Sequence, residues 1–357
     1  MKKILYIITR IEKSGPNRVL ENMVSGIDQN KYKIYILSLF DNKDVFQKYP
    51  NVDYLSLSLN NILDVFTKGK KLIRELEEKI NPDIVHSHGI FPDYLNTFFK
   101  KPYKVCTLHC NIFEDYRYGY NKLKSLLMIK FHLWSLKRID KVVCCSQSVF
   151  NEINKIKYSN LTFVENGIKN ETIKANIDVR KELQIDKKEI VYIYVGNLSK
   201  RKNILSLTNM FENNIKDNEH FIILGYGELK EEIERIALKK ENIHILGFKN
   251  DVYNYLSAAD VYVSASLTEG LSISVLEALG NGLILFLSDI ESHKEFFGKD
   301  NTYLGEYFSE EDFKLKLNNI RKRIGKIDKK DIIKYQNNHF SDKSMMKEYE
   351  VIYEGKK

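Results

Sequence analysis

The sequence lacks long apolar runs. Its longest runs, such as ILYII and IVYIYV, have the length of a buried strand and fall far short of the about 20 residues that cross a bilayer. The start has a basic tip and a short apolar run, but charges return at Arg10, Glu12 and Lys13, and no small-residue cleavage site follows. We therefore expect a first buried strand in place of a signal peptide, and a cytoplasmic protein.

Cysteines are also few. The 4 in the chain are Cys106, Cys110, Cys144 and Cys145, which form neither a C-x-x-C motif nor the regular spacing of a disulfide framework. They lie in apolar, strand-like contexts, which favours reduced, buried thiols. A zinc site that includes His109 is the alternative.

Basic charge is unevenly spread along the chain. The net charge is +8, and residues 1–168 hold 26 basic and 17 acidic side chains, so this half carries the whole excess. A basic half indicates an anionic partner, which could be phosphate, nucleic acid or a membrane surface. Interleaved aromatic repeats and recognised nucleic-acid modules are missing, so we expect no nucleic acid.

Short β-branched runs alternate with longer helical patterns, which indicates parallel βαβ units. The first half predicts strands over 3–8, 32–39, 83–88, 103–109, 141–146 and 161–166, with helices near 17–28, 64–80, 119–138 and 147–156. The second half predicts strands over 190–196, 220–225, 243–247, 261–266 and 283–288, with helices near 203–215, 228–240, 251–257, 272–279 and 291–297, and a last helix over 341–357.

A polar stretch over 169–189 interrupts the alternation and is the best linker candidate. The chain is thus predicted to be α/β, with two Rossmann-like doubly wound domains, 1–168 and 169–340. The last helix is expected to pack back on the first domain. Two such domains would face each other across a cleft, with ligands at the carboxyl ends of the strands.

The first loop of interest is SGPNRV, where Gly15 allows a close backbone approach and a helix is expected to start at about Asn17. A helix N-terminus suits phosphate or a polar acceptor. The stretch is not G-x-G-x-x-G, so the dinucleotide fingerprint is absent and an ordinary strand–helix turn remains equally compatible.

The second is YVGNLSKRKN, in which Lys200, Arg201 and Lys202 crowd the entry to a helix after Gly196. Cations at a helix N-terminus oppose the helix dipole, so their presence favours a bound anion over a solvated charge run. The turns LGYGEL and LGF follow the next two strands, with Gly225 in the first. Glycines at the ends of three successive strands resemble the floor of a ligand cleft more than simple strand terminators.

The fourth stretch, TEGLSISVLEALGNG, holds Glu269 in a loop and Glu277 on the following helix. The N–H groups of about Leu271–Ser274 are not paired within the helix and could hold a phosphate. Glu277 has apolar neighbours and would need a partner, such as a ribose diol. The alternative is a capping acid at 269 and a surface residue at 277.

SLTEGLSISVLEALGNG resembles the E-x7-E signature of family 4 glycosyltransferases, which are retaining, metal-independent nucleotide-sugar transferases of the GT-B fold. VGNLSKRKN is similar to their phosphate-binding loop, LGYGEL to their Gly-rich turn and LGF to their base-contacting turn. SGPNRVLENM, DIVHSHG and VENGI resemble further motifs of the family. The ordered set covers nearly the whole chain.

The resemblance implies roles for individual residues. His109 and Glu269 would contact the donor sugar and are the implied catalytic residues, Glu277 would bind the ribose, and Lys202 would meet the diphosphate. The first domain would bind the acceptor and the second the nucleotide sugar. The remaining implied donor-binding residues are Gly15, Asn197, Arg201, Gly225, Phe248, Gly270, Leu271, Ser272, Ile273 and Ser274.

One position departs from the family. Asn197 stands where the family usually has arginine, which removes a bidentate phosphate contact, and Arg201 could compensate from one turn away. There is no Asp-x-Asp motif, so no metal cofactor is expected.

The helix near 119–138 bears on the acceptor. Its apolar and basic residues at helical spacing fit either a core-packed helix with a basic edge or an interfacial helix on anionic lipid. The set is Leu123, Leu126, Leu127, Lys130, Phe131 and Trp134, flanked by Lys122, Lys124, Lys137 and Arg138. The second interpretation fits a lipid-linked glycan acceptor and a peripheral position on the inner face of the plasma membrane.

We therefore expect a transferase that moves a sugar from a UDP-sugar to a glycan in capsular or other surface polysaccharide synthesis. The alternatives are a GT-B-type epimerase and, because of Asn197, a non-catalytic partner of another transferase. A phosphorylase would need a pyridoxal lysine and a far longer chain.

Overall fold

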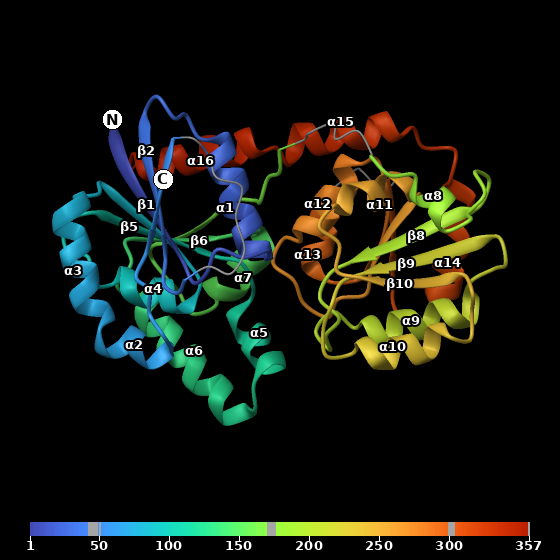
Figure 1. The fold of residues 1–357 in the computed structure, drawn as a ribbon, viewed down its shortest axis with the longest axis horizontal. Coiled ribbons are helices and arrows are strands. Elements are labelled where there is room, and N and C mark those ends of the chain that lie inside the picture. Colours follow the sequence, from blue (N-terminus) through green and yellow to red (C-terminus); the bar gives the residue numbers. More distant parts are fainter. Residues whose placement is uncertain (42–48, 50, 170–175, 299–303, 356–357) are drawn as a thin grey trace. The chain divides into compact units, whose positions relative to one another are not determined.

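The computed structural model describes residues 1–41, 49, 51–169, 176–298 and 304–355. The chain divides into two compact units, an N-terminal unit of Met1–Lys169 with Asp342–Lys357 and a C-terminal unit of Asn170–Ser341 (Figure 1). Part of the expected linker, residues 170–175, lies outside the described residues.

The N-terminal unit is built on a sheet of parallel strands in the order β3-β2-β1-β4-β5-β6-β7. The inner strands β1 and β4 are almost completely buried because helices cover both faces. The strands are β1 Lys2–Ile8, β2 Tyr32–Ser38, β3 Val52–Ser56, β4 Ile84–His88, β5 Tyr103–Leu108, β6 Lys141–Cys144 and β7 Leu161–Phe163.

Polar side chains cap most helices of this unit at their N-termini; Ser14, Asn61 and Ser146, for example, each accept a backbone N–H of the first turn. The helices are α1 Gly15–Gly26, α2 Ile62–Thr67, α3 Gly69–Ile80, α4 Ile90–Asn96, α5 Ile112–Gly119, α6 Lys122–Leu136, α7 Gln147–Asn154 and, from the end of the chain, α16 Asp342–Tyr353.

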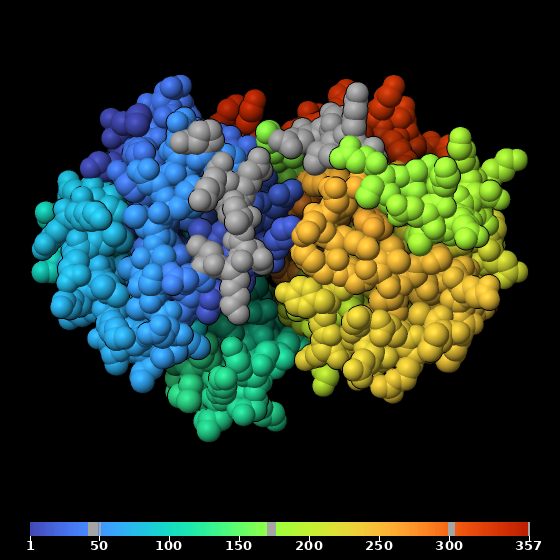
Figure 2. Space-filling model, in the orientation of Figure 1, coloured from blue at the N-terminus to red at the C-terminus, as the bar shows by residue number. Residues whose placement is uncertain are grey.

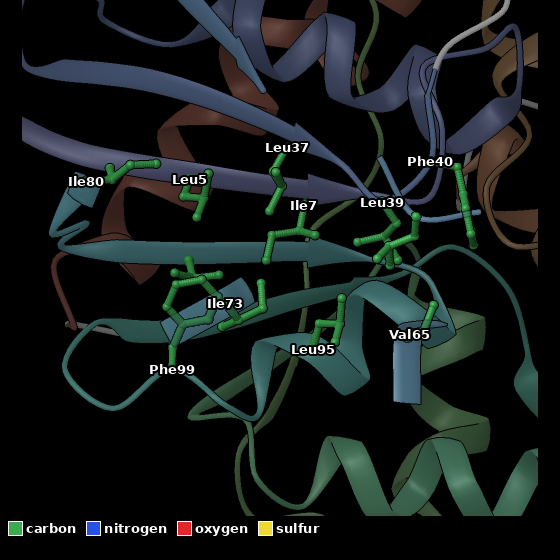
Figure 3. Close-up of a cluster of buried hydrophobic side chains, with 12 residues drawn as sticks. Leu5, Ile7, Leu37, Leu39, Phe40, Val65, Ile73, Ile80, Leu95 and Phe99 are labelled. Carbon is green, nitrogen blue, oxygen red and sulfur yellow. The ribbon is translucent and has the colours of Figure 1, made fainter. Parts of the chain in front are cut away.

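Alternate residues of β1 serve two cores. Leu5 and Ile7 face a cluster that includes Val65 of α2, Ile73 of α3 and Leu95 of α4 (Figure 3). On the other face, Tyr6 meets Tyr353 of α16, with their hydroxyl oxygens 3.2 Å apart. The last helix of the chain is therefore a structural part of the N-terminal unit, where it packs against α1.

The C-terminal unit repeats the plan with the strand order β10-β9-β8-β11-β12-β13, again parallel. Its strands are β8 Ile190–Val195, β9 Glu219–Leu224, β10 Ile243–Gly247, β11 Val261–Ser264, β12 Ile284–Ser288 and β13 Gly305–Phe308. Its helices are α8 Val179–Glu182, α9 Ile204–Asn214, α10 Lys230–Ala237, α11 Val252–Ala258, α12 Ile273–Gly280, α13 Glu291–Lys294, the 3-10 helix η1 Glu295–Phe297, α14 Phe313–Arg323 and α15 Lys329–His339.

The two doubly wound sheets confirm the predicted fold class, and several predicted elements are corrected. The first helix begins at Gly15, earlier than expected, because Ser14 caps it. The helix expected near 119–138 corresponds to α6, which begins later than expected because the Asn121 side chain caps it. The helix expected near 64–80 divides into α2 and α3. The elements missed by the sequence analysis are β3, α4, α5, α8, β13, α14 and α15.

Among the described residues, we find no helix with the length and apolar character needed to span a membrane.

Candidate functional site

In both sheets the chain order reverses between two neighbouring strands, which are β1 and β4 in the N-terminal unit and β8 and β11 in the C-terminal unit. Such a reversal leaves a crevice outside the carboxyl ends of the strands, where ligands of open α/β sheets bind. The loops that follow β8 and β11 are joined directly, because Leu267 N donates to Arg201 O at 3.0 Å.

Glu269 lies in the loop after β11 and is buried. Its carboxylate accepts from the Lys202 ammonium in a short contact, from Arg201 Nη1 at 3.3 Å and from Ser266 Oγ at 2.6 Å. Arg201 Nη1 also donates to Thr268 O at 3.0 Å. Three residues that the sequence analysis singled out, Arg201, Lys202 and Glu269, thus lie together at the carboxyl edge of the C-terminal sheet.

The electrostatics of Glu269 follow from these contacts. Burial alone would raise the pKa of the carboxyl, but Lys202 and Arg201 more than offset this and hold the pKa at about 2. Glu269 is therefore a carboxylate at all ordinary pH values, and it offsets one of the two positive charges of Arg201 and Lys202.

The first turn of α12 has no side-chain cap and no acidic residue. Ser272 and Ser274 are half-buried there, and the Ser274 hydroxyl accepts from Tyr262 at 2.8 Å. A helix start with positive dipole and no capping side chain is compatible with an anionic ligand. Glu277 lies in the next turn, half-buried between the buried Leu276 and Ala278.

Gly225 and Gly227 lie where neighbouring backbone leaves no room for a side chain. Gly225 has φ +148, and an added Cβ would stand 1.8 Å from Gly196 O. A Cβ on Gly227 would stand 2.3 Å from Leu198 O. The sequence alone attributes the glycines at these strand ends to a ligand cleft. In the structure, Gly225 and Gly227 lie instead against the backbone of the loop after β8, which leaves no room for a side chain.

Phe248 and Tyr226 form an exposed aromatic pair beside these loops, with ring centroids 6.0 Å apart. Gly225 N donates to Gly247 O at 2.9 Å and so joins the two turns that carry the rings. Exposed π-faces can stack on a nucleobase. Asn197 is exposed on the neighbouring loop, where its backbone oxygen accepts from Tyr194 Oη at 2.9 Å.

In the N-terminal unit, Gly15 is exposed at the start of α1, and an added Cβ would meet nothing within 4 Å. Asn17 is buried, and its Nδ2 donates to Arg10 O at 2.8 Å and Glu12 O at 2.6 Å, so it fixes the loop after β1. The space at Gly15 is thus left open beside a rigid loop.

His109 follows β5 and is half-buried, and burial lowers its pKa to about 4. Its Nε2 lies 2.9 Å from Nδ1 of His88, the last residue of β4. Among the described residues there is no cluster of three or more His, Cys, Asp or Glu side chains that could hold a metal. His109 is therefore a neutral ring held by a second histidine, and the suggested zinc site gains no support.

The structure brings together Arg201, Lys202 and Glu269, and it places Gly225 with Phe248 on joined turns. Sequence reasoning missed Ser266 and Tyr226 at this edge. Ser266 lies three residues before Glu269, but its hydroxyl is identified only by the contact. Tyr226 lies inside the quoted turn LGYGEL and could have been found as an aromatic between two glycines.

Two family signatures match most of the chain between them. Residues 176–338 match the family described as Glycosyl transferases group 1, and residues 13–172 match the family described as Glycosyltransferase Family 4.

Curated relatives agree with these matches. The chain is 27% identical over 308 residues to the O-antigen biosynthesis glycosyltransferase WclY of Escherichia coli, across 83% of this chain and 82% of that protein. It is 28% identical over 246 residues to the UDP-Gal:alpha-D-GlcNAc-diphosphoundecaprenol alpha-1,3-galactosyltransferase of Escherichia coli, across 61% of each chain.

Among solved structures, the fold is similar to that of Anabaena Alr3699/HepE, determined in complex with UDP and glucose. The TM-score is 0.80 at 13% sequence identity, over 99% of this chain and 100% of that one. This likeness shows that the fold is of the GT-B type.

We predict that the free energy of unfolding depends on pH through Glu269. Its folded pKa of about 2 lies below the ordinary glutamate value of 4.5, so its stabilising effect is complete above pH 5 and is lost as the pH falls toward 2. Urea unfolding should therefore show a deficit of about 2–3 kcal/mol for Glu269→Gln at pH 6, shrinking steadily at pH 5, 4 and 3.5.

The matched control is Glu234→Gln, on the surface of α10, where an exposed ion pair contributes under about 1 kcal/mol at any pH. A Glu269→Gln deficit that does not change with pH would contradict the assignment of a carboxylate stabilised by cations.

We also predict opposite outcomes for two glycine substitutions. Gly225→Ala should lose more than about 2 kcal/mol of stability, because its Cβ would collide with Gly196 O in a backbone conformation that alanine disfavours. Gly15→Ala should change stability by less than about 0.5 kcal/mol, since nothing lies near the new methyl group. Equal losses in chemical denaturation would show that the loop after β1 is more crowded than described.

Proposed function

Because the chain belongs to glycosyltransferase family 4 and is a glycosyltransferase of the hexosyltransferase type, we propose that it is a retaining enzyme that transfers a sugar from a UDP-sugar to a lipid-linked glycan in surface polysaccharide synthesis. The proposal of a UDP-sugar donor rests mainly on one observation: Lys202 and Arg201 both contact Glu269, just before the uncapped first turn of α12. Positive charge and amide dipoles converge there, as a diphosphate requires.

Each group at this edge has a proposed role. The diphosphate competes with Glu269 for Lys202 and Arg201, and the released carboxylate accepts hydrogen bonds from sugar hydroxyls. Glu277 takes the ribose diol, and Phe248 with Tyr226 takes the base. Arg201 supplies a guanidinium that Asn197 does not, which is supported by its position against Glu269 in place of bulk water.

The transfer step conserves atoms without a covalent enzyme intermediate. The bond from the sugar C1 to the diphosphate oxygen breaks, and the acceptor oxygen bonds to C1 from the same face. The acceptor proton passes to the departing phosphate oxygen, so that the products are UDP and an α-linked glycan. The cations and amides already present stabilise the developing charge of the diphosphate, so we propose that no metal is needed.

The acceptor part rests on the relatives and on one surface. A relative's name specifies a UDP-galactose donor and a diphosphoundecaprenol-linked acceptor, and another acts in O-antigen biosynthesis. A glycan carried on a membrane lipid would require the enzyme to approach a membrane surface.

The helix α6 presents such a surface. Its buried side is largely polar and includes Ser125, His132 and Ser135, because His132 Nε2 bonds to the buried Asp93 Oδ2 at 2.7 Å. The leucines of its first two turns point outward instead: Leu123 is 71% exposed and Leu127 is 59% exposed. The core-packed alternative for these leucines is therefore wrong for the described residues.

Helix α2 extends the same surface. Phe66 of α2 packs on Phe131 of α6, with ring centroids 5.7 Å apart, and Ile62 and Leu63 of α2 are 52% and 68% exposed. We call the exposed residues Ile62, Leu63, Phe66, Leu123, Leu126, Leu127 and Trp134 the apolar surface (α2 and α6 in Figure 1; the green atoms of α6 in Figure 2). Exposed Lys122, Lys124, Lys130, Lys137 and Arg138 flank it, which favours a membrane with anionic lipids on the inner face of the plasma membrane.

The donor proposal is tested first by thermal shift with UDP, UDP-glucose, UDP-galactose and UDP-N-acetylglucosamine, and then by the anomeric configuration of the product. Lys202→Ala and Glu269→Gln should each lower kcat/KM by about 100-fold, because each removes a charged contact to the donor. Lys230→Ala, an exposed cation on α10, is the matched control. A β-linked product, or activity lost on chelation and restored by a divalent metal, would refute the scheme.

The same assay separates the epimerase alternative. An epimerase would convert the sugar of the donor without net release of UDP, whereas the transferase releases UDP in step with glycan product.

The membrane proposal predicts salt-sensitive sedimentation with vesicles that contain phosphatidylglycerol, and little with phosphatidylcholine alone. The triple variant Leu123→Ser, Leu126→Ser and Leu127→Ser should lose most of this binding. Leu238→Ser, at an 87% exposed leucine of the C-terminal unit, should not. Equal binding by both variants would place the contact elsewhere.

A further inference from the structure

Three histidines form a stack at the carboxyl edge of the N-terminal sheet. His86 and His88 lie on β4, and His109 follows β5. The rings of His86 and His88 are 4.5 Å apart at 23°, and those of His88 and His109 are 5.1 Å apart at 23°. His88 is thus the middle ring, in contact with His109 by stacking and through the 2.9 Å bond from Nδ1 to Nε2.

The deepest ring is fixed at both nitrogens. His86 Nδ1 lies 2.7 Å from Tyr353 Oη, and His86 Nε2 lies 2.8 Å from Thr107 Oγ1. Tyr353 Oη in turn lies 3.2 Å from Tyr6 Oη. The ring of His86, at the buried end of the stack, is therefore held in one orientation.

The rings are neutral near pH 7. Burial lowers the pKa of His86 and His88 well below the usual range, with the neighbouring histidines adding to the effect, and it lowers that of His109 to about 4. A neutral imidazole carries one N–H, so only one of the two facing nitrogens of His88 and His109 holds a proton.

The surroundings of His88 Nε2 indicate whether the shared proton is on His88 Nδ1 or on His109 Nε2. His88 is 3% exposed, and its Nε2 is buried with no hydrogen-bond partner among the described residues. If His109 were the donor, the proton of His88 would sit on that Nε2 as a buried N–H without an acceptor, at a cost of about 1–3 kcal/mol. Unpaired buried donors are rarer than unpaired acceptors. The preference of free histidine for a proton on Nε2 acts in the opposite direction at both rings, so the assignment rests on the missing acceptor at Nε2 of His88.

We propose that His88 is a positioning residue, whose Nδ1–H donates to Nε2 of His109 and thereby places the proton of His109 on Nδ1. His109 then presents an N–H donor through its remaining nitrogen. On the proposed function, this donor meets a hydroxyl or phosphate oxygen of the nucleotide sugar, and His109 does not act as a general base.

The protonation pattern can be measured without any substrate. In protein labelled with ¹⁵N-histidine, long-range ¹⁵N–¹H correlation at pH 7.5 should show a protonated Nδ1 and a bare Nε2 for His109. The resonances are assigned by their loss in His109→Asn. A proton on Nε2 of His109 would overturn the proposal, and this result would not depend on whether a UDP-sugar is the donor.

Variants of His88 test the positioning role. An asparagine amide nitrogen can take the place of Nδ1, so His88→Asn should keep the proton of His109 on Nδ1, whereas His88→Leu should release it. With the UDP-sugar found by thermal shift, His88→Leu should lower kcat by about 10- to 100-fold, the range seen when metal-ligating histidines lose their outer hydrogen-bond partners. His88→Asn should recover most of that loss.

Tyr353→Phe is the structural control, because it removes a hydroxyl from the buried end of the stack and leaves the bond between His88 and His109 in place. Its ¹⁵N pattern for His109 should match the unmodified protein. Equal activity losses in His88→Asn and His88→Leu, with the protonation of His109 unchanged, would show that His88 matters only for packing.

Discussion

A carboxylate withdrawn from water beside two cations organises the carboxyl edge of the C-terminal sheet. A buried charge is tolerated only when its partners are close and well directed, and Glu269 meets Lys202, Arg201 and Ser266 within hydrogen-bonding reach. These contacts, together with the bond from Leu267 N to Arg201 O, join the loops after β8 and β11. Gly225, which follows β9, packs directly on Gly196 in the loop after β8. These two segments can approach so closely only because Gly225 has no side chain. These candidate residues are therefore held together by contacts within the C-terminal unit itself.

The candidate residues of the two units lie at equivalent places in their sheets but differ in chemical character. Each places its candidate residues beyond the point where the strand order reverses. The C-terminal unit gathers full charges and an uncapped helix start, which suit a diphosphate. The N-terminal unit gathers neutral imidazole rings and an open position at Gly15, which suit hydroxyl groups and close approach.

The buried parallel strands could be predicted from the sequence because both of their faces are covered, which leaves continuous apolar runs such as β8. The short strand β3 could not, because it is half-exposed and lacks such a run. Glycines and acids at the strand ends located the candidate loops, but the sequence could not show that Glu269 pairs with Lys202, because that contact depends on the packing of two loops. The orientation of α6 was equally hidden. By periodicity alone, Leu123, Leu126 and Leu127 could face a core, but the side of the helix that carries His132 is buried instead, where His132 pairs with Asp93. His88 stood in a quoted motif, yet its role is visible only from the pairing of β4 with β5.

The placement of α16 has a consequence for the order of events during synthesis. The tyrosines at 349 and 353 complete the interior beneath β1, β4 and β5, although they are translated after the entire C-terminal unit. While the ribosome is still making that unit, the first sheet has one face incompletely covered, with Tyr6 and His86 lacking their phenol partners. Apolar surface that is transiently exposed in this way makes incompletely folded chains prone to aggregate. The N-terminal unit is thus begun before the C-terminal unit and completed after it.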